Sequence, residues 1–260
     1  MGVLNVTPDS FSDGGSFLSP TAAVRRALQM EADGADIIDI GGESTRPNSL
    51  GISQEEELKR VIPVLRRLKK RLKIPISVDT TKASVAEACL REGASIINDI
   101  SGLRCDERIA SVCARYSAGL VIMHMKGTPR TMQKRPGYKN LLKEIELYLK
   151  KSIQIACSKG VRKENIIIDP GIGFGKKLVH NLKIMKELSF FKKLGFCILI
   201  GLSRKSFMGE VLGMDISERM VPTIAADTIA ILNGANIIRV HDVKEAVIAA
   251  KITDAIRKSR

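Results

Sequence analysis

Short runs of mostly β-branched and other apolar residues recur eight times along the chain, and each run leads into a polar or glycine-rich cluster. With these clusters, the runs cover residues 3–5, 37–39, 76–79, 96–98, 120–124, 166–169, 198–201 and 237–241. Between most of them lies an amphipathic segment long enough for a helix. Buried parallel strands read as apolar runs, and alternation of strand and helix is typical of crossover units. Eight such units predict a single α/β domain with the (β/α)8 fold, the TIM barrel.

Polar side chains end most of these predicted strands. In a TIM barrel the active site lies at the C-terminal ends of the strands and in the loops that follow them. The residues at these ends are Asn5, Asp39, Asp79, Asn98, Asp169, Arg239 and His241. A single polar residue at the end of a buried strand can be an accident. Seven that converge on one mouth indicate a site.

The composition fits one globular domain over residues 1–260. The length is close to the roughly 250 residues of one barrel, and 44% hydrophobic residues support a sizeable core. No apolar run reaches the roughly 18 residues that span a bilayer, and the N-terminus lacks the features of a signal peptide, so we expect no membrane partner. Five cysteines without a CxxC pair suit buried, reduced thiols, which favours a cytoplasmic protein.

The net charge of +14 attracts anions. The most basic stretch, residues 59–73, carries Val61, Leu65, Leu68 and Leu72 at helical spacing, which predicts the solvated outer face of a barrel helix. Nucleic-acid binding usually adds aromatic stacking platforms. The chain has no Trp and three Tyr, so we expect no nucleic-acid partner.

The first loop, residues 5–15, is rich in Asn, Asp and Ser and ends in a glycine pair. Asn and Asp oxygens are ligands that Mg²⁺ prefers, and this ion typically shares its shell with substrate phosphates. A turn built on Asx and Ser hydrogen bonds is the alternative.

The second loop, residues 39–47, combines backbone freedom with polar side chains. Gly41 and Gly42 let the backbone approach a ligand closely. Thr45 offers a hydroxyl, and Arg46 offers a planar fork suited to phosphate or carboxylate. A plain glycine turn is the alternative.

Asp79, Asn98 and Asp169 end three of the predicted strands. A carboxylate at the end of a buried strand is costly unless something donates to it. An aminopyrimidine edge presents N–H donors that a set of Asp and Asn side chains matches. The alternative is that all three residues cap helices.

The segment 169–176 has the glycine content of a nucleotide-binding loop but fails both nucleotide patterns. Pro170 stands where a P-loop needs its first Gly, and Lys177 stands where it needs Ser or Thr. Lys176 also takes the place of the third Gly of the dinucleotide pattern. We therefore expect a rigid wall that presents Asp169 and Phe174.

Cations gather after the seventh and eighth predicted strands, where barrels often bind phosphate at a helix N-terminus. Ser203 can cap the helix that follows, and Arg204 and Lys205 add charge. Arg239 and His241 lie two residues apart and so on the same side of a strand. Arg204, Lys205, Arg239 and His241 predict a positive pocket for a diphosphate, with a structural histidine as the alternative for His241.

The remaining histidines do not predict a metal site. His124 and His180 lack partners at metal-ligand spacing. Met123 and Met125, which flank His124, are expected in the core and the pocket lining.

Over essentially its whole length the chain resembles the dihydropteroate synthases of the folate pathway. Six segments carry the resemblance, in order: MGVLNVTPDSFSDGG; DIGGESTRP; ISVDTTKA with IINDISGL; VIMHMKGTPRTMQ; DPGIGFGK; and GLSRKSFMGEVLG followed by IIRVHDV. The resemblance implies condensation of 6-hydroxymethyl-7,8-dihydropterin diphosphate with p-aminobenzoate, with Mg²⁺, to give 7,8-dihydropteroate and diphosphate. Relatives usually carry residues ahead of the first strand, and some carry a fused kinase that is absent from these residues.

The resemblance also implies a role for each site residue. Asp79, Asp169, Lys205, Arg239 and His241 form the catalytic set. The pterin is expected at Asp79, Asn98, Asp169 and Lys205, between Ile100 and Met123 and near Gly201. The diphosphate is expected at Thr45, Arg239 and His241, with Asn5 as the Mg²⁺ ligand, and p-aminobenzoate at Thr45, Arg46, Pro47, Phe174, Ser203 and Arg204. Thr7, Asp9, Phe11 and Asp13 belong to a mobile loop, and we expect a homodimer.

Two other functions compete with this interpretation. A pterin-binding methyltransferase that works with methyltetrahydrofolate and a corrinoid partner shares the Asp, Asn, Asp pocket. It has no need for the segments 45–47 and 203–205 or for Arg239 with His241. A non-enzymatic basic barrel that binds nucleic acid is the third possibility. Dihydropteroate synthesis fits better also because p-aminobenzoate has a neutral amine that needs no strong general base, and none is obvious here.

Overall fold

The computed structural model describes residues 1–7, 19–47 and 49–259, and a parallel barrel forms its centre. Within these residues eight parallel strands follow one another in chain order: β1 (Gly2–Asn5), β2 (Ile38–Gly41), β3 (Ile76–Asp79), β4 (Ile96–Asp99), β5 (Gly119–Met123), β6 (Ile166–Asp169), β7 (Cys197–Gly201) and β8 (Ile237–Arg239). A bridge between Gly2 and Val240 joins the first strand to the residue after the last. Every predicted strand is present, which confirms the TIM barrel.

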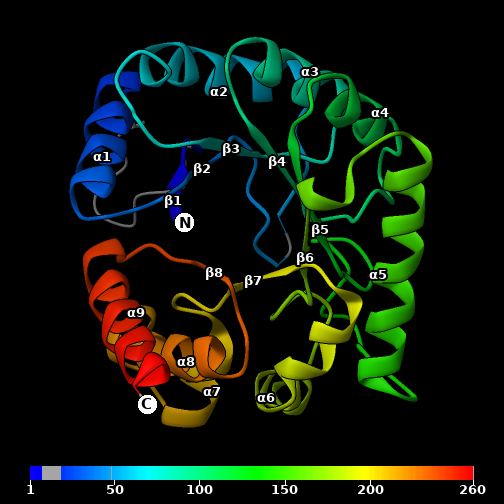
Figure 1. Cartoon of the computed structure of the whole chain (residues 1–260), viewed down its shortest axis with the longest axis vertical. Coiled ribbons are helices and arrows are strands. Elements are labelled where there is room, and N and C mark those ends of the chain that lie inside the picture. The colour runs from blue at the N-terminus through cyan, green and yellow to red at the C-terminus, as the bar shows by residue number, and fades with distance from the viewer. Residues whose placement is uncertain (8–18, 48, 260) are drawn as a thin grey trace.

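The helices form an outer ring around the strands (Figure 1). In the described part of the chain they are α1 (Pro20–Ala32), α2 (Gln54–Leu68), α3 (Ala83–Arg91), α4 (Arg108–Arg115), α5 (Leu141–Ser158), α6 (Leu178–Lys186), α7 (Ser206–Leu212), α8 (Met220–Leu232) and α9 (Val243–Lys258), with 3-10 turns at Lys163–Asn165, Leu188–Leu194 and Ile216–Glu218. Val61, Leu65 and Leu68 of α2 are buried, which confirms the apolar stripe predicted beneath the basic stretch. None of the described helices is both long and apolar enough to cross a bilayer.

Successive strand residues alternate between the helices and the barrel interior. One set, which includes Ile38, Ile40 and Val78, packs in the large core between strands and helices. The other set builds a separate apolar cluster inside the barrel from Met1, Ile37, Ile96, Val121, Ile167, Leu199 and Ile237. Two residues further along the same strands stand Val3, Asp39, Asn98, Met123, Asp169, Gly201 and Arg239. The apolar cluster therefore lies directly beneath the residues that carry the polar side chains Asp39, Asn98, Asp169 and Arg239.

Two expectations about buried residues are wrong in detail. Asp39 does not end its strand, because β2 continues to Gly41; Asp39 therefore lies deeper and is fully buried. The thiols of Cys89 and Cys113 are buried as expected, but Cys105 and Cys197 are exposed. All five cysteines are free thiols.

Candidate functional site

Three acceptor groups converge at the mouth from β3, β4 and β6. Asp79 Oδ2 accepts from Arg239 Nη2 at 3.2 Å, Asn98 Nδ2 donates to Asp39 Oδ2 at 3.0 Å, and Asp169 Oδ1 accepts from the Gly171 N–H at 2.7 Å. Within the described residues, the second oxygen of Asp79 and of Asp169 and the side-chain oxygen of Asn98 have no hydrogen-bond partner. These three oxygens are therefore available to N–H donors of a ligand.

The alternative that these three residues cap helices is wrong. The N-cap residue is Lys82 for α3, Glu107 for α4 and Lys177 for α6. The polar groups at the strand ends therefore do not cap the helices that follow them, and their partners in the structure are Arg239, Asp39 and the Gly171 N–H.

Burial favours the protonated form of the Asp79 and Asp169 carboxyl groups. Burial raises the pKa of Asp79 to about 8, although the Arg239 guanidinium opposes the rise. Burial also raises the pKa of Asp169, against the nearby Lys205 ammonium and the Gly171 N–H. Donors on a ligand would favour the charged form of both groups, which only accepts hydrogen bonds.

A small apolar cluster separate from the main core lies at the same mouth. It consists of the buried side chains of Ile100, Met123, Met125 and Met132, with Phe174 packed against them. Thioether side chains adapt to flat ring systems. Met123 and Met125 are thus buried together, as expected, with Met132 beside them, and Met125 also lines the cleft described below.

The segment 169–176 forms the wall that its sequence predicted. Lys176 is buried, and its Nζ donates to the carbonyl oxygens of Gly171 at 2.7 Å and Phe174 at 3.0 Å. Gly171 has a φ of 73°, and a Cβ at this position would lie 2.0 Å from the carbonyl oxygen of His124. The buried Lys176 side chain and an obligatory glycine therefore hold this loop against β5, and Phe174 packs from it against the apolar cluster of the mouth.

His124 contacts the same buried Lys176 side chain. Its Nδ1 lies 2.9 Å from Lys176 Nζ, and its ring lies edge-on to Tyr148 with centroids 4.8 Å apart. Burial, with the Lys176 ammonium, lowers the pKa of His124 to about 2. His124 is thus a neutral structural residue, as its sequence context indicated.

Two of the four cations expected to form a positive pocket do not supply a free positive charge. The Arg204 guanidinium is paired with Asp242 through contacts of 2.7 and 3.0 Å. Burial and the nearby Arg239 lower the pKa of His241 to about 4, so its ring is neutral at pH 7. The predicted pocket is therefore less positive than four cations would make it, because Asp242 offsets Arg204 and burial keeps His241 neutral.

Of the other two cations, Arg239 is also paired with carboxylates, whereas Lys205 has no ion-pair partner among the described residues. Lys205 Nζ donates to the carbonyl of Ile172 and lies 4.6 Å from the centroid of the Phe174 ring. Burial lowers the pKa of Lys205 to about 8, although Asp169 opposes this shift. Arg239 bridges Asp39, at 2.7 Å from its Nε, and Asp79.

Ser203 has a different role from the one predicted. It does not cap α7, whose N-cap residue is Lys205 and which has no side-chain cap. The Ser203 hydroxyl oxygen instead accepts from the His241 backbone N–H at 3.2 Å and lies 3.0 Å from His241 Nδ1. Ser203 thus ties the loop after β7 to the segment after β8.

Asn5 and the described part of the second loop lie on the side of β1 and β2. Asn5 Oδ1 would lie 3.3 Å from a Cβ on Gly41, so it stands beside the end of β2. Gly42 packs against α2 so closely that a Cβ would lie 2.6 Å from Val61 Cγ2. Thr7 is buried, and Arg46 and Pro47 are exposed. Asp9, Phe11 and Asp13 lie outside the described residues.

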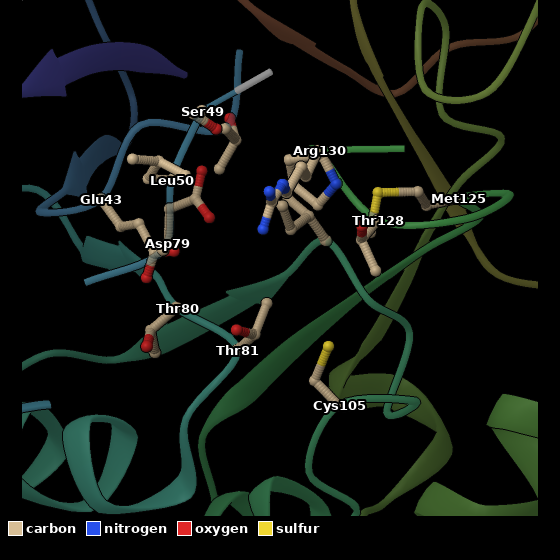
Figure 2. Close-up of a pocket in the computed structure, with 14 residues that line it drawn as sticks. Glu43, Ser49, Leu50, Asp79, Thr80, Thr81, Cys105, Met125, Thr128 and Arg130 are labelled. Atoms are coloured by element: carbon tan, nitrogen blue, oxygen red, sulfur yellow. The ribbon is translucent and has the colours of Figure 1, made fainter. Parts of the chain in front are cut away.

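A cleft of about 240 Å³ opens between the loops after β2, β3 and β5 (Figure 2). Thr45, Asp79, Ile100, Met125 and Arg130 are among the residues that line it. Figure 2 shows Glu43 and Leu50 on one side of the cleft and Met125 and Thr128 on the other. The cleft therefore extends the site from Asp79 towards the second loop.

A buried ion pair beneath the second loop was missed from the sequence. Lys82 Nζ contacts Glu57 Oε2 at 2.6 Å and also Glu43 of the second loop. Glu57 is fully buried. The available signal was that Glu57 continues the stripe of Val61 and Leu65, because a carboxylate on the buried face of a helix requires a cation.

We predict that Lys82→Met lowers the free energy of unfolding by about 3 kcal/mol, because it leaves Glu57 buried without a counter-charge. Lys69→Met, which removes a more exposed ion pair with Glu92, should cost less than about 1 kcal/mol. Urea denaturation of both variants measures the difference. Equal losses would contradict a stabilising role for the buried pair.

Comparison with known proteins places this site in a family. The sequence profile of the pterin binding enzymes matches residues 1–241. The chain belongs to this family. Within the family, a dihydropteroate synthase from Synechocystis sp. is 46% identical over 98% of this chain and 89% of its own length.

Solved structures of family members agree with the fold. The dihydropteroate synthase of Yersinia pestis, in a complex with a sulfonamide drug, has a TM-score of 0.95 and 41% identity and covers 99% of this chain and 94% of its own. That of Clostridium difficile, obtained in the presence of pteroic acid, has a TM-score of 0.93 and 47% identity over 99% and 96% of the two chains. The chain therefore groups with the dihydropteroate synthases among the pterin binding enzymes.

Proposed function

We propose that the mouth of this barrel condenses 6-hydroxymethyl-7,8-dihydropterin diphosphate with p-aminobenzoate to give 7,8-dihydropteroate and diphosphate. The observation that carries the proposal is the set of three unpartnered oxygens on Asp79, Asn98 and Asp169 beside an apolar cluster. A pterin offers a matching edge of N–H donors and a flat ring. The family membership supports the same reaction.

The pterin subsite combines these acceptors with the apolar cluster. Asp79, Asn98 and Asp169 receive the N–H edge of the ring, and Lys205 donates to the ring from the side of Phe174. Ile100 and Met123 cover the faces of the ring. Gly201 ends β7 at this place and leaves room because it has no side chain.

The chemistry needs stabilisation of charge more than it needs a base. The C–O bond between the pterin methylene and the diphosphate breaks, the electron pair leaves with the diphosphate, and the amine of p-aminobenzoate forms the new C–N bond and loses a proton. This amine is neutral at pH 7 and nucleophilic without activation. Arg239, Thr45 and His241 would hold the departing diphosphate, where fixed donors act most strongly as charge develops.

The carboxylate of p-aminobenzoate requires a cation near the mouth. Thr45, Arg46 and Pro47 approach from the second loop, and Phe174, Ser203 and Arg204 from the other side. The Arg204 guanidinium is paired with Asp242, whereas that of Arg46 has no ion-pair partner among the described residues. We therefore assign the carboxylate to Arg46 and the packing of the ring to Pro47 and Phe174.

Asn5 is suited to hold the Mg²⁺ that the family implies. No cluster of three or more His, Cys, Asp or Glu side chains that could hold a metal occurs in the described ranges. Mg²⁺ in phosphate-handling sites needs only one or two protein oxygens beside those of the substrate. The amide oxygen of Asn5 at the barrel mouth fits this requirement. When bound, the ion would offset negative charge on the diphosphate.

One assay tests the proposed reaction. The purified protein is mixed with the pterin diphosphate, p-aminobenzoate and Mg²⁺, and dihydropteroate and diphosphate are quantified. We expect the two products in equal amounts, and none when p-aminobenzoate is omitted. Pterin binding without any dihydropteroate would contradict the proposal and would favour the methyltransferase alternative.

We also propose a homodimer that forms through α8 and α9. These neighbouring helices expose Val221, Ile229, Leu232, Ile248, Ile252 and Ile256, each at least 50% accessible. The last three recur every four residues, which makes an apolar seam along α9. A second copy carries the same seam, and homodimer interfaces are more apolar than ordinary surfaces.

We predict that Ile252→Glu converts a dimer into a monomer, because it places a charge in the centre of this seam. Light scattering of the eluted protein measures the mass. Leu147→Glu is the matched control, because Leu147 is 64% exposed on α5, on another side of the barrel. A wild-type monomer, or an unchanged mass of the Ile252 variant, would contradict the proposed interface.

A further inference from the structure

Asp39 is a fully buried carboxylate that touches two residues of the proposed site. Its Oδ2 accepts from Asn98 Nδ2 at 3.0 Å and from Arg239 Nε at 2.7 Å. These contacts join β2, β4 and β8 through one atom. Its Oδ1 is buried and has no partner among the described residues. Asp39 lies one inward position below Gly41, so it does not reach the mouth itself.

We propose that Asp39 is a positioning residue for pterin binding, which fixes the orientation of the Asn98 amide and of the Arg239 guanidinium. This inference rests on the proposed function and extends it to a residue below the ligand. It assigns to Asp39 no contact with the substrate.

The chemistry of the amide explains why an acceptor oxygen is needed at this position. The two ends of an Asn side chain have the same shape, but one donates and the other accepts hydrogen bonds. A carboxylate paired with a guanidinium accepts and has nothing to donate, so Asn98 must turn its Nδ2 towards Asp39. The Asn98 oxygen is then the end that remains for the ligand. Without Asp39 the amide can rotate and present a donor to the N–H edge of a pterin.

The same oxygen also orients Arg239. Its Nε is held by Asp39 and its Nη2 by Asp79 at 3.2 Å, so two carboxylates define the plane of the guanidinium. Nη1 is then left for a ligand, because no other described residue bonds to it. Asp39 thus aligns one acceptor and one donor in the same layer of the barrel.

The test uses two substitutions that separate shape, charge and hydrogen bonding. Asp39→Leu keeps a similar volume but removes the acceptor, and we expect it to weaken binding of 6-hydroxymethylpterin about tenfold or more. Asp39→Asn keeps one oxygen at the shared position and should stay within about threefold of wild type. Calorimetry gives the affinities, and thermal unfolding gives the stability. The test depends on pterin affinity alone, so a failure to form dihydropteroate would contradict the proposed reaction without deciding the role of Asp39.

Ser77→Ala is the matched control. Ser77 is the register partner of Asp39 on β3, is fully buried, and its hydroxyl has no partner in the described part of the chain. We expect this variant to bind the pterin as wild type does. If Asp39→Leu does not fold, Asp39→Ser replaces it, because the shorter hydroxyl cannot reach both donors.

Coupling to Asn98 distinguishes positioning from general damage. In an Asn98→Ala background, Asp39→Leu should cause a loss of pterin affinity that is smaller by about threefold or more. Asn98 is one of the two groups that Asp39 orients, and this background lacks its amide. Unchanged pterin affinity in Asp39→Leu, equal losses in Asp39→Leu and Asp39→Asn, or losses that multiply fully with Asn98→Ala would each overturn the proposal.

Discussion

Asp169→Asn is expected to lower pterin affinity by about one to two decades and to leave the barrel folded. Asp169 Oδ1 is held by the Gly171 N–H at 2.7 Å, and the second oxygen is the one proposed to meet the pterin. The amide keeps the first contact but replaces the second oxygen with a donor, which then faces the N–H edge of the ring. A lost charge-assisted hydrogen bond costs about 1.5–3 kcal/mol, and the opposed donors add to this loss.

The fold should survive because the substitution relieves burial of charge. Burial already raises the pKa of Asp169, so the neutral amide costs less to bury than the carboxylate. Asp227→Asn is the matched control, since Asp227 is equally buried, with its pKa raised to about 7 by burial, but lies on α8 away from the mouth. Calorimetry with 6-hydroxymethylpterin should show a large loss for the first variant and none for the second. Equal affinities would contradict the assignment of Asp169.

The barrel could be predicted from the sequence because its signal is local. Each apolar run needed only its own residues to read as a buried strand, and the residue after it pointed to the mouth. Period-two alternation then placed Asn98, Asp169 and Arg239 on the inner side with the apolar floor two residues before them. These positions depend on backbone geometry that a strand of four residues already fixes.

What the sequence did not reveal are the pairings between distant side chains. Arg204 and Asp242 are 38 residues apart, and Lys82 and Glu57 are 25 apart. Nothing in their neighbourhoods shows that they meet. Asp39 was placed at the wrong depth for a related reason, since the two residues that follow it, Ile40 and Gly41, read equally well as strand or loop.

Arg239 and Lys205 are the remaining cations of the mouth, and we expect their removal to have different consequences. Arg239 presents Nη1 beside the carboxylates that hold its other nitrogens, so it is proposed to bind the diphosphate. Lys205 lies against Phe174 and the segment 169–176, so it is proposed to reach the pterin ring. Arg239→Ala should therefore weaken binding of the pterin diphosphate far more than binding of the free pterin, whereas Lys205→Ala should weaken binding of both ligands alike.

The ratio of the affinity for free pterin to the affinity for pterin diphosphate distinguishes the two proposed roles. Arg239→Ala also removes the partner of Asp39 and Asp79, and this damage to the pterin pocket lowers both affinities and cancels in the ratio. The remaining loss of one charge-assisted contact corresponds to about one to two decades in favour of free pterin. Lys205→Ala should leave the ratio within about threefold of wild type, although each affinity falls. Calorimetry with 6-hydroxymethylpterin and with its diphosphate gives all four values. Equal ratios in the two variants would mean that both cations serve the same part of the substrate, and Arg239 would then belong to the pterin subsite with Asp39 and Asn98.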